Sequence, residues 1–98
     1  MASMKISGRM LVKSFKAQFK ETFGIGVRLY NGSRFADDEA TLASIRKGDA
    51  KGGDVEIHGN LKVGNAEKLI LENFGIKIQI EDKEGNLADN NHTLGSLK

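Results

Sequence analysis

Few side chains in this chain are of the types that act as acids, bases or metal ligands. Histidine occurs twice, as His58 and His92, and neither stands in a pattern that pairs it with a nucleophile or with other ligands. Cysteine is absent, which excludes disulfides, thiolate metal sites and cysteine nucleophiles. We therefore expect a protein that is not an enzyme and that uses neither a cofactor nor a metal ion.

The acidic triplet Asp37, Asp38 and Glu39 is a group of possible oxygen ligands. Hard cations take such ligands, but adjacent acids just ahead of a short helix more often face the positive end of its dipole. The loop 82–86 also carries oxygen ligands, yet it lacks the spacing and the terminal glutamate of a calcium loop. We interpret the triplet as an acidic surface that a partner can contact.

Basic residues gather in the first third of the chain. Residues 1–34 carry seven Lys and Arg against one Glu, a net charge of +6, whereas residues 35–98 carry −4. Lys13, Lys16 and Lys20 recur at helical spacing and, with Arg9, form what we call the basic ridge. Such a ridge can follow a phosphate backbone, and the opposite charges of the two parts can also join two copies head to tail.

An internal repeat predicts how these residues are positioned. Residues 4–46 align with residues 55–98 with one single-residue gap before Ala36, and twelve aligned positions are identical. The identical residues are mostly glycines, apolar residues and cap-forming polar residues, as expected of a duplicated fold. Residues 47–54 contain Gly48, Gly52 and Gly53 and are predicted to form a flexible joint.

Each repeat shows the order strand, helix, strand and short helix. The predicted helices bury two sets of residues at spacings of three and four, namely Val12, Phe15, Phe19 and Phe23, and Val63, Ala66, Ile70 and Phe74. Gly24 and Gly75 are expected to end them in the left-handed conformation. Short helices anchored by Leu42 and Ile45, or Leu94 and Leu97, should be capped by Asp37 or Thr41, and by Asp89 or Thr93.

This order indicates an α+β fold of the ferredoxin-like type. Two interlocked β-α-β units would form one four-stranded sheet in the order 4-1-3-2, with both main helices on one face. The other face would be exposed and would carry Arg28, Tyr30 and His58 among its side chains.

A second architecture remains open. The run from Val27 to Ile45, followed by Val55-Glu56-Ile57, resembles the second half of a ubiquitin-like β-grasp domain, with a strand, a turn, an Asp-rich loop, a short helix and a last strand. The resemblance covers this run only and implies a protein-recognition scaffold. The segment before the first predicted helix is too short for the N-terminal hairpin of that family.

Length and composition favour one domain, residues 4–98, because neither repeat alone would bury enough apolar surface. Residues 1–3 precede Met4 and resemble a vector-derived leader. The absence of cysteine, of an apolar run near 18 residues and of a signal peptide favours a cytoplasmic protein without a membrane segment.

Taken together, the sequence predicts a small protein-interaction or self-assembly module with a basic first repeat and an acidic second repeat. The predicted contact residues are Arg9, Lys13, Lys16, Lys20, Arg28, Tyr30, Asp37, Asp38, Glu39 and His58. The alternative is a nucleic-acid-binding domain that uses the basic first helix.

Overall fold

The computed structural model describes residues 3–45 and 54–97. Two helices of twelve residues form where apolar side chains recur every three or four positions: α1 spans Val12–Phe23 and α2 spans Val63–Phe74. All side chains that the spacing places on one face are buried, namely Val12, Phe15, Phe19 and Phe23 of α1 and Val63, Ala66, Ile70 and Phe74 of α2. The helical predictions are therefore confirmed.

Both helices end at a glycine in the left-handed conformation. Gly24 has a φ of 74° and donates its N–H to the carbonyl of Lys20, and Gly75 has a φ of 66° and donates to the carbonyl of Leu71. A side chain at either position would be strained, because L residues rarely adopt positive φ. The predicted helix ends are confirmed.

Five strands form two antiparallel sheets in the described part of the chain. β1 (Ser3–Ile6) pairs with β4 (Val55–His58), whereas β2 (Val27–Asn31) lies between β3 (Arg34–Phe35) and β5 (Lys77–Ile80). Each sheet thus joins a strand from the first half of the chain to a strand from the second half.

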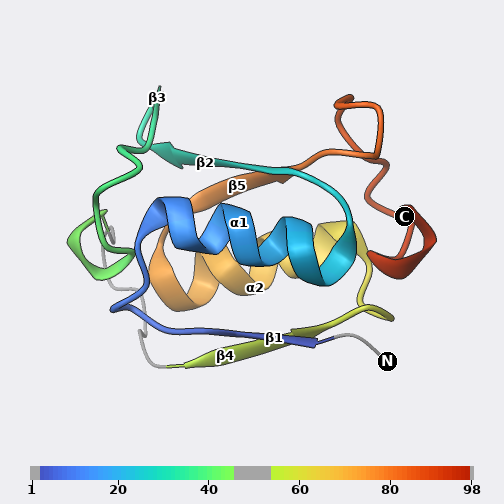
Figure 1. The fold of residues 1–98 in the computed structure, drawn as a ribbon, viewed down its shortest axis with the longest axis horizontal. Coiled ribbons are helices and arrows are strands. Elements are labelled where there is room, and N and C mark those ends of the chain that lie inside the picture. Colours follow the sequence, from blue (N-terminus) through green and yellow to red (C-terminus); the bar gives the residue numbers. More distant parts are fainter. Residues whose placement is uncertain (1–2, 46–53, 98) are drawn as a thin grey trace.

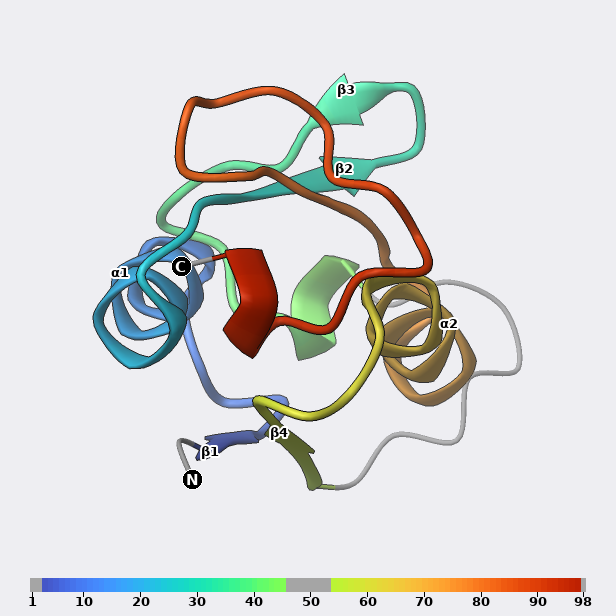
Figure 2. The ribbon, with the colours of Figure 1, turned by 90° about the vertical axis from the view of Figure 1, so that its right-hand side faces the viewer.

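The two sheets lie on opposite sides of the helices. Figure 1 shows the β2–β5 pair above the helices and the β1–β4 pair below them. Figure 2, viewed from one end, shows α1 and α2 as the two side walls between the sheets. The short helices η1 (Ala43–Ile45) and η2 (Gly95–Leu97) close the two ends.

The expectation of a single four-stranded sheet with both helices on one face was wrong. β1, β2, β4 and β5 each have one apolar face, as predicted, but β1 and β2 belong to different sheets because α1 carries the chain across the core. The β-grasp alternative also differs from the structure, since β4 pairs with β1 and not within the sheet of β2. The coarser prediction of a small α+β fold is confirmed.

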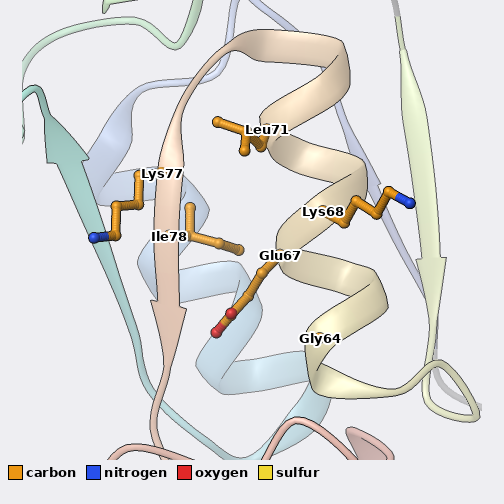
Figure 3. A pocket seen from close by; sticks show the side chains of 6 residues that line it. All are labelled: Gly64, Glu67, Lys68, Leu71, Lys77 and Ile78. Atoms are coloured by element: carbon orange, nitrogen blue, oxygen red, sulfur yellow. The ribbon is translucent and has the colours of Figure 1, made fainter.

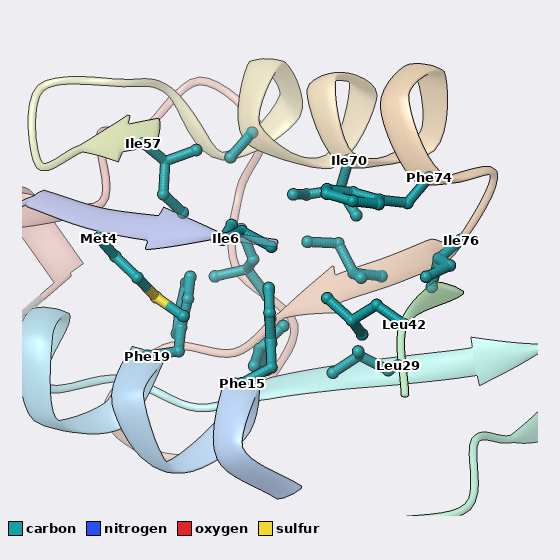
Figure 4. Close-up of a cluster of buried hydrophobic side chains, with 14 of the residues drawn as sticks. Met4, Ile6, Phe15, Phe19, Leu29, Leu42, Ile57, Ile70, Phe74 and Ile76 are labelled. Carbon is teal, nitrogen blue, oxygen red and sulfur yellow. The ribbon is translucent and has the colours of Figure 1, made fainter. Parts of the chain in front are cut away.

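The core is apolar throughout the described residues. No polar or charged residue is buried there, and the buried hydrophobic residues include four phenylalanines. Phe19 lies between Phe15 and Phe23, with ring centroids 6.0 Å and 5.0 Å away. Figure 4 shows Phe15 and Phe19 of α1 and Ile70 and Phe74 of α2 reaching into the same cluster. The space between the two sheets is therefore filled from both helices.

The short helices are single 3-10 turns held by threonines. Thr41 Oγ1 accepts the N–H of Ser44 at 3.2 Å, and Thr93 Oγ1 accepts the N–H of Ser96 at 3.3 Å. Asp37 and its aligned residue Asp89 instead accept N–H groups two residues ahead and so shape the preceding turn. Of the two predicted types of cap, the threonines are confirmed.

Two sequence predictions, the leader and the joint between the repeats, fall at the margins of the described residues. Ser3, assigned to a leader, is the first residue of β1 and pairs with His58, whereas Met1 and Ala2 lie outside the described residues, as does the predicted joint except for Asp54. Across residues 3–45 and 54–97, no helix is long and apolar enough to cross a membrane.

Replacing Phe19 by alanine should lower the free energy of unfolding by about 3–5 kcal/mol, because the side chain is fully buried and touches aromatic neighbours on both sides. Urea denaturation followed by circular dichroism measures this loss. Lys20→Ala on the exposed face of the same helix is the control and should stay within about 0.5 kcal/mol of wild type. Equal losses for both variants would contradict the assignment of the buried face.

Candidate interaction face

The outer face of the three-stranded sheet carries polar and aromatic side chains that are exposed or partly exposed. Strand alternation buries Val27 and Leu29 and turns Arg28 and Tyr30 outward. On the neighbouring strand, Lys77 lies opposite Tyr30, and Gln79 lies opposite Arg28. Four polar or aromatic side chains from two strands thus share one surface.

An aromatic pair lies at one end of this surface. Tyr30 pairs with Phe35 of β3, and their rings stack with centroids 5.1 Å apart and planes 21° apart. Phe35 is 67% exposed, the largest exposed fraction of any large apolar residue within residues 3–45 and 54–97. Lys77 Nζ lies 5.7 Å from the Tyr30 ring centroid, within cation–π range. We call the surface made by Arg28, Tyr30, Phe35, Lys77 and Gln79 the Tyr30–Phe35 face.

Hydrogen bonds hold three side chains of this face, those of Arg28, Tyr30 and Gln79. The Tyr30 hydroxyl donates to Gln79 Oε1 at 2.7 Å. Arg28 Nε donates to Glu81 Oε2 at 2.6 Å, and a second guanidinium nitrogen donates to the carbonyl of Gly85 at 3.3 Å. The hydrogen bond to Glu81 raises the pKa of Arg28 above its usual value, so its charge is permanent. The face is ordered before any partner binds it.

His58 does not belong to this face. The sequence prediction put it on the same exposed sheet surface as Arg28 and Tyr30, but β4 pairs with β1 on the opposite side of the helices. There its Nε2 atom lies 3.4 Å from Glu56 Oε1, and both side chains are about half exposed. The proposed joint contact surface of Arg28, Tyr30 and His58 is therefore wrong.

The basic ridge and the acidic triplet contact each other. Lys13 Nζ lies 2.8 Å from Glu39 Oε1, and Lys16 Nζ lies 2.8 Å from Asp38 Oδ1. The hydrogen bond to Glu39 also raises the pKa of Lys13. Exposed pairs of this kind add little to stability, but they partly neutralise both surfaces.

The rest of the ridge and the triplet do not take part in these pairs. Arg9 and Lys20 are exposed, and Asp37 uses Oδ1 to accept the N–H of Glu39 at 2.9 Å. The predicted contact residues thus divide between the Tyr30–Phe35 face, the paired ridge and loop, and the separate surface around His58.

Neither main helix offers a free N-terminus to an anion. In α1, the N–H groups of Val12 and Lys13 donate to the carbonyls of Ala40 and Asp38 at 2.8 Å and 3.0 Å. In α2, Val63 and Gly64 donate to His92 and Asn90 in the same way. Among residues 3–45 and 54–97, no three His, Asp or Glu side chains are placed to hold a metal ion.

Glu67 is a half-buried carboxylate between α2 and β5. Its Oε2 atom accepts the backbone N–H of Ile80 at 3.1 Å, on the edge of β5 that faces away from β2. Burial raises the pKa of this carboxyl above its ordinary value of 4.5, and the hydrogen bond from Ile80 and the charge of Lys77 oppose the shift.

The predicted contact residues did not include Phe35, Lys77, Gln79 or Glu67, although Lys77 and Gln79 were expected on the same exposed sheet face as Arg28 and Tyr30. A signal for Phe35 was present, since Asn31-Gly32 favours a tight turn that returns the chain beside Tyr30, and Gly32 has a φ of 69°. Comparisons with family models, with curated proteins and with solved structures give no match.

Replacing Glu67 by glutamine should leave the protein at least as stable as wild type at pH 7, with a gain below about 1 kcal/mol because solvent screens the carboxylate. A carboxyl whose folded pKa is raised holds its proton more tightly in the folded state, so the stability of wild type falls as pH rises through the window above 4.5. Glutamine can still accept from Ile80 and does not titrate.

Chemical denaturation at pH 7 and near pH 4 measures this difference, which should shrink at the lower pH as the wild-type carboxyl is protonated. Glu72→Gln, at an exposed position of the same helix, corrects for the change in net charge. A Glu67→Gln variant that is less stable at pH 7 but equal to wild type near pH 4 would contradict the assignment.

Proposed function

We propose that this chain is a non-enzymatic protein-interaction module and that the Tyr30–Phe35 face contacts its partner. The observation that carries the proposal is the exposed Phe35 ring stacked on Tyr30, whose hydroxyl is hydrogen-bonded to Gln79. Tyrosine, phenylalanine and arginine are enriched at protein interfaces. The aromatic side chains bury large areas while losing little conformational freedom.

The fixed geometry of the face supports binding to a preformed surface. Tyr30 and Gln79 hold each other across β2 and β5, and Arg28 is held by Glu81. Side chains that are already ordered lose less entropy when a partner arrives. Lys77 adds a positive charge beside the aromatic pair and so favours a partner with acidic groups there.

A separate partner is better supported than head-to-tail self-assembly. The self-assembly form of the proposal needs a free basic surface and a free acidic surface on each copy. Lys13 and Lys16 instead pair with Glu39 and Asp38 of the same molecule. These pairs reduce the charge that a second copy could complement.

We also propose that the two halves of the chain arose by duplication and form one domain. The strand registers support this: exchanging aligned positions turns the pair Met4–Ile57 into Val55–Ile6, which is also a pair. The same exchange turns Val27–Ile80 into Ile78–Leu29 in the other sheet. Both helices, moreover, have twelve residues and the same kind of glycine end.

Phe35→Ala should reduce partner capture at least about tenfold, because an exposed aromatic anchor is the kind of residue that dominates an interface. Tagged wild-type protein and the variant are used for quantitative affinity capture from the native host, and the captured protein is then titrated in purified form. The free energy of unfolding should change by less than about 1 kcal/mol, since Phe35 is exposed.

Leu87→Ala is the matched control, because Leu87 is a large apolar residue that is 52% exposed and lies outside the Tyr30–Phe35 face. It should capture the partner as wild type does. A partner that binds Phe35→Ala and wild type equally would show that the face has been misassigned.

A second candidate function, binding of single-stranded nucleic acid, is favoured by the same aromatic pair. Exposed aromatic rings beside cations can stack bases, and Arg34 and Lys77 flank this pair. Against it, the ridge lysines Lys13 and Lys16 are paired with acidic residues.

We expect no measurable binding of a fluorescent twelve-nucleotide oligomer at about 50 mM salt by anisotropy. The nucleic-acid function would replace our proposal if binding occurred, fell steeply with added salt and disappeared in Phe35→Ala. Lys13→Glu and Lys16→Glu would then show whether the ridge contributes.

A further inference from the structure

A pocket of about 340 Å³ lies between α2 and β5. Its lining consists of Gly64, Glu67, Lys68, Leu71, Lys77 and Ile78. Figure 3 shows Leu71 and Glu67 extending from the helix toward the strand, with Ile78 facing them. Leu71 is 52% exposed, so a large apolar side chain stands at this pocket with solvent on one side.

The strand that borders the pocket has an open backbone edge. β5 is the last named strand of its sheet, although residues 86–88 already bridge to its outer edge at Ile80, Glu81 and Asp82. The hydrogen bond from Glu81 N–H to Gly26 fixes which residues of β5 face β2. By strand alternation, the N–H and C=O groups of Ile78 and Ile80 point away from β2. Ile80 is satisfied by Glu67 and by Ala88, but no hydrogen bond among the described residues involves the Ile78 backbone on this edge.

Three of the pocket residues differ in character from the residues that they align with in the first half. Gly64, Glu67 and Leu71 align with Lys13, Lys16 and Lys20 of the basic ridge. In the first half, Lys13 and Lys16 extend to the acidic triplet and cover the corresponding helix surface. In the second half, Asn90 packs against Gly64, and Leu71 is an exposed leucine at the position that aligns with Lys20.

We infer that the groove between α2 and β5 binds an extended peptide segment of a partner protein, which adds as a strand to the edge of β5. The inference rests on the proposed function, because Lys77 belongs to both the groove and the Tyr30–Phe35 face. A partner bound to that face could therefore extend continuously onto the neighbouring edge of β5. The Ile78 N–H and C=O groups complement one residue of an added strand.

Strand geometry specifies the side chains of the segment. The residue opposite Ile78 points to the same side as Ile78, into the pocket beside Leu71, and should be apolar. The residue opposite Lys77 points to the outer face and should be acidic, because Lys77 takes part in no salt bridge among the described residues. The segment is therefore expected to alternate apolar and acidic residues.

The test uses a phage-displayed library of random heptapeptides selected on the whole wild-type chain. We expect enrichment of peptides with an apolar residue next to an acidic one. Synthetic versions should bind Leu71→Lys at least about tenfold more weakly than wild type, because lysine reproduces the first-half residue at the pocket. Asn65→Lys, which adds the same charge at an exposed position of α2 outside the pocket lining, should change binding less than about twofold.

Backbone pairing is tested separately on the enriched peptides. N-methylation of the apolar residue removes the donor to the Ile78 carbonyl and keeps every side chain, so it should weaken binding by about tenfold or more. Equal binding of the methylated peptide, or of the Leu71→Lys variant, would overturn the inference. No enrichment over background would also overturn it.

The outcomes separate this inference from the proposed function. If enriched peptides bind Leu71→Lys normally but not Phe35→Ala, the Tyr30–Phe35 face is the contact surface and the groove is not. If the chain itself forms dimers in light scattering that Leu71→Lys abolishes, a second copy occupies the edge and the inferred partner segment is wrong.

Discussion

The structure depends on strand pairing between the two halves of the chain. β1 finds its partner in β4, and β2 finds its long partner in β5, so neither half contains a complete sheet pair of its own apart from the two-residue β3. Both sheets turn their apolar faces toward the same two helices. The hydrophobic core therefore exists only when both halves are in place, and the short strands are stabilised by the packing beneath them.

This constraint leaves the outer surfaces free to diverge. Residues that face the core keep their apolar character in both halves, as Val12 and Val63 or Phe23 and Phe74 do. Outside the core, the first half closes its helix surface with salt bridges to the acidic triplet, whereas the second half presents Leu71 beside an open strand edge. The differences between the halves thus coincide with the surfaces that a partner could use.

The amino-acid sequence was sufficient for the local elements. Spacing of Phe15, Phe19 and Phe23 identified α1, the glycine at position 24 identified its end, and alternation identified the strands with their buried faces. These features are set by neighbouring residues and by the requirement that apolar side chains be buried.

The pairing of strands that are distant in the sequence could not be predicted from such local patterns. The alternation of residues predicts which face of β4 is apolar, but it does not predict which strand pairs with β4. His58 was therefore assigned to the same surface as Tyr30, whereas it lies on the other sheet. The pairing of Lys13 with Glu39 spans 26 residues and depends on the path of the loop between them. Of the five residues of the Tyr30–Phe35 face, only Arg28 and Tyr30 were among the predicted contact residues.

The central claim is that the outer edge of β5 is open at Ile78 and can bind a partner segment. Hydrogen exchange of individual β5 amides, measured by NMR on the free protein, tests the open edge most directly. The register places the N–H groups of Lys77 and Gln79 in the ladder with β2, and Glu67 holds the N–H of Ile80. The account predicts that Ile78 exchanges at least about a hundredfold faster than Gln79 and Ile80, because its N–H lies on an open edge. Protection of Ile78 equal to that of its neighbours would contradict the open edge, and with it the binding groove.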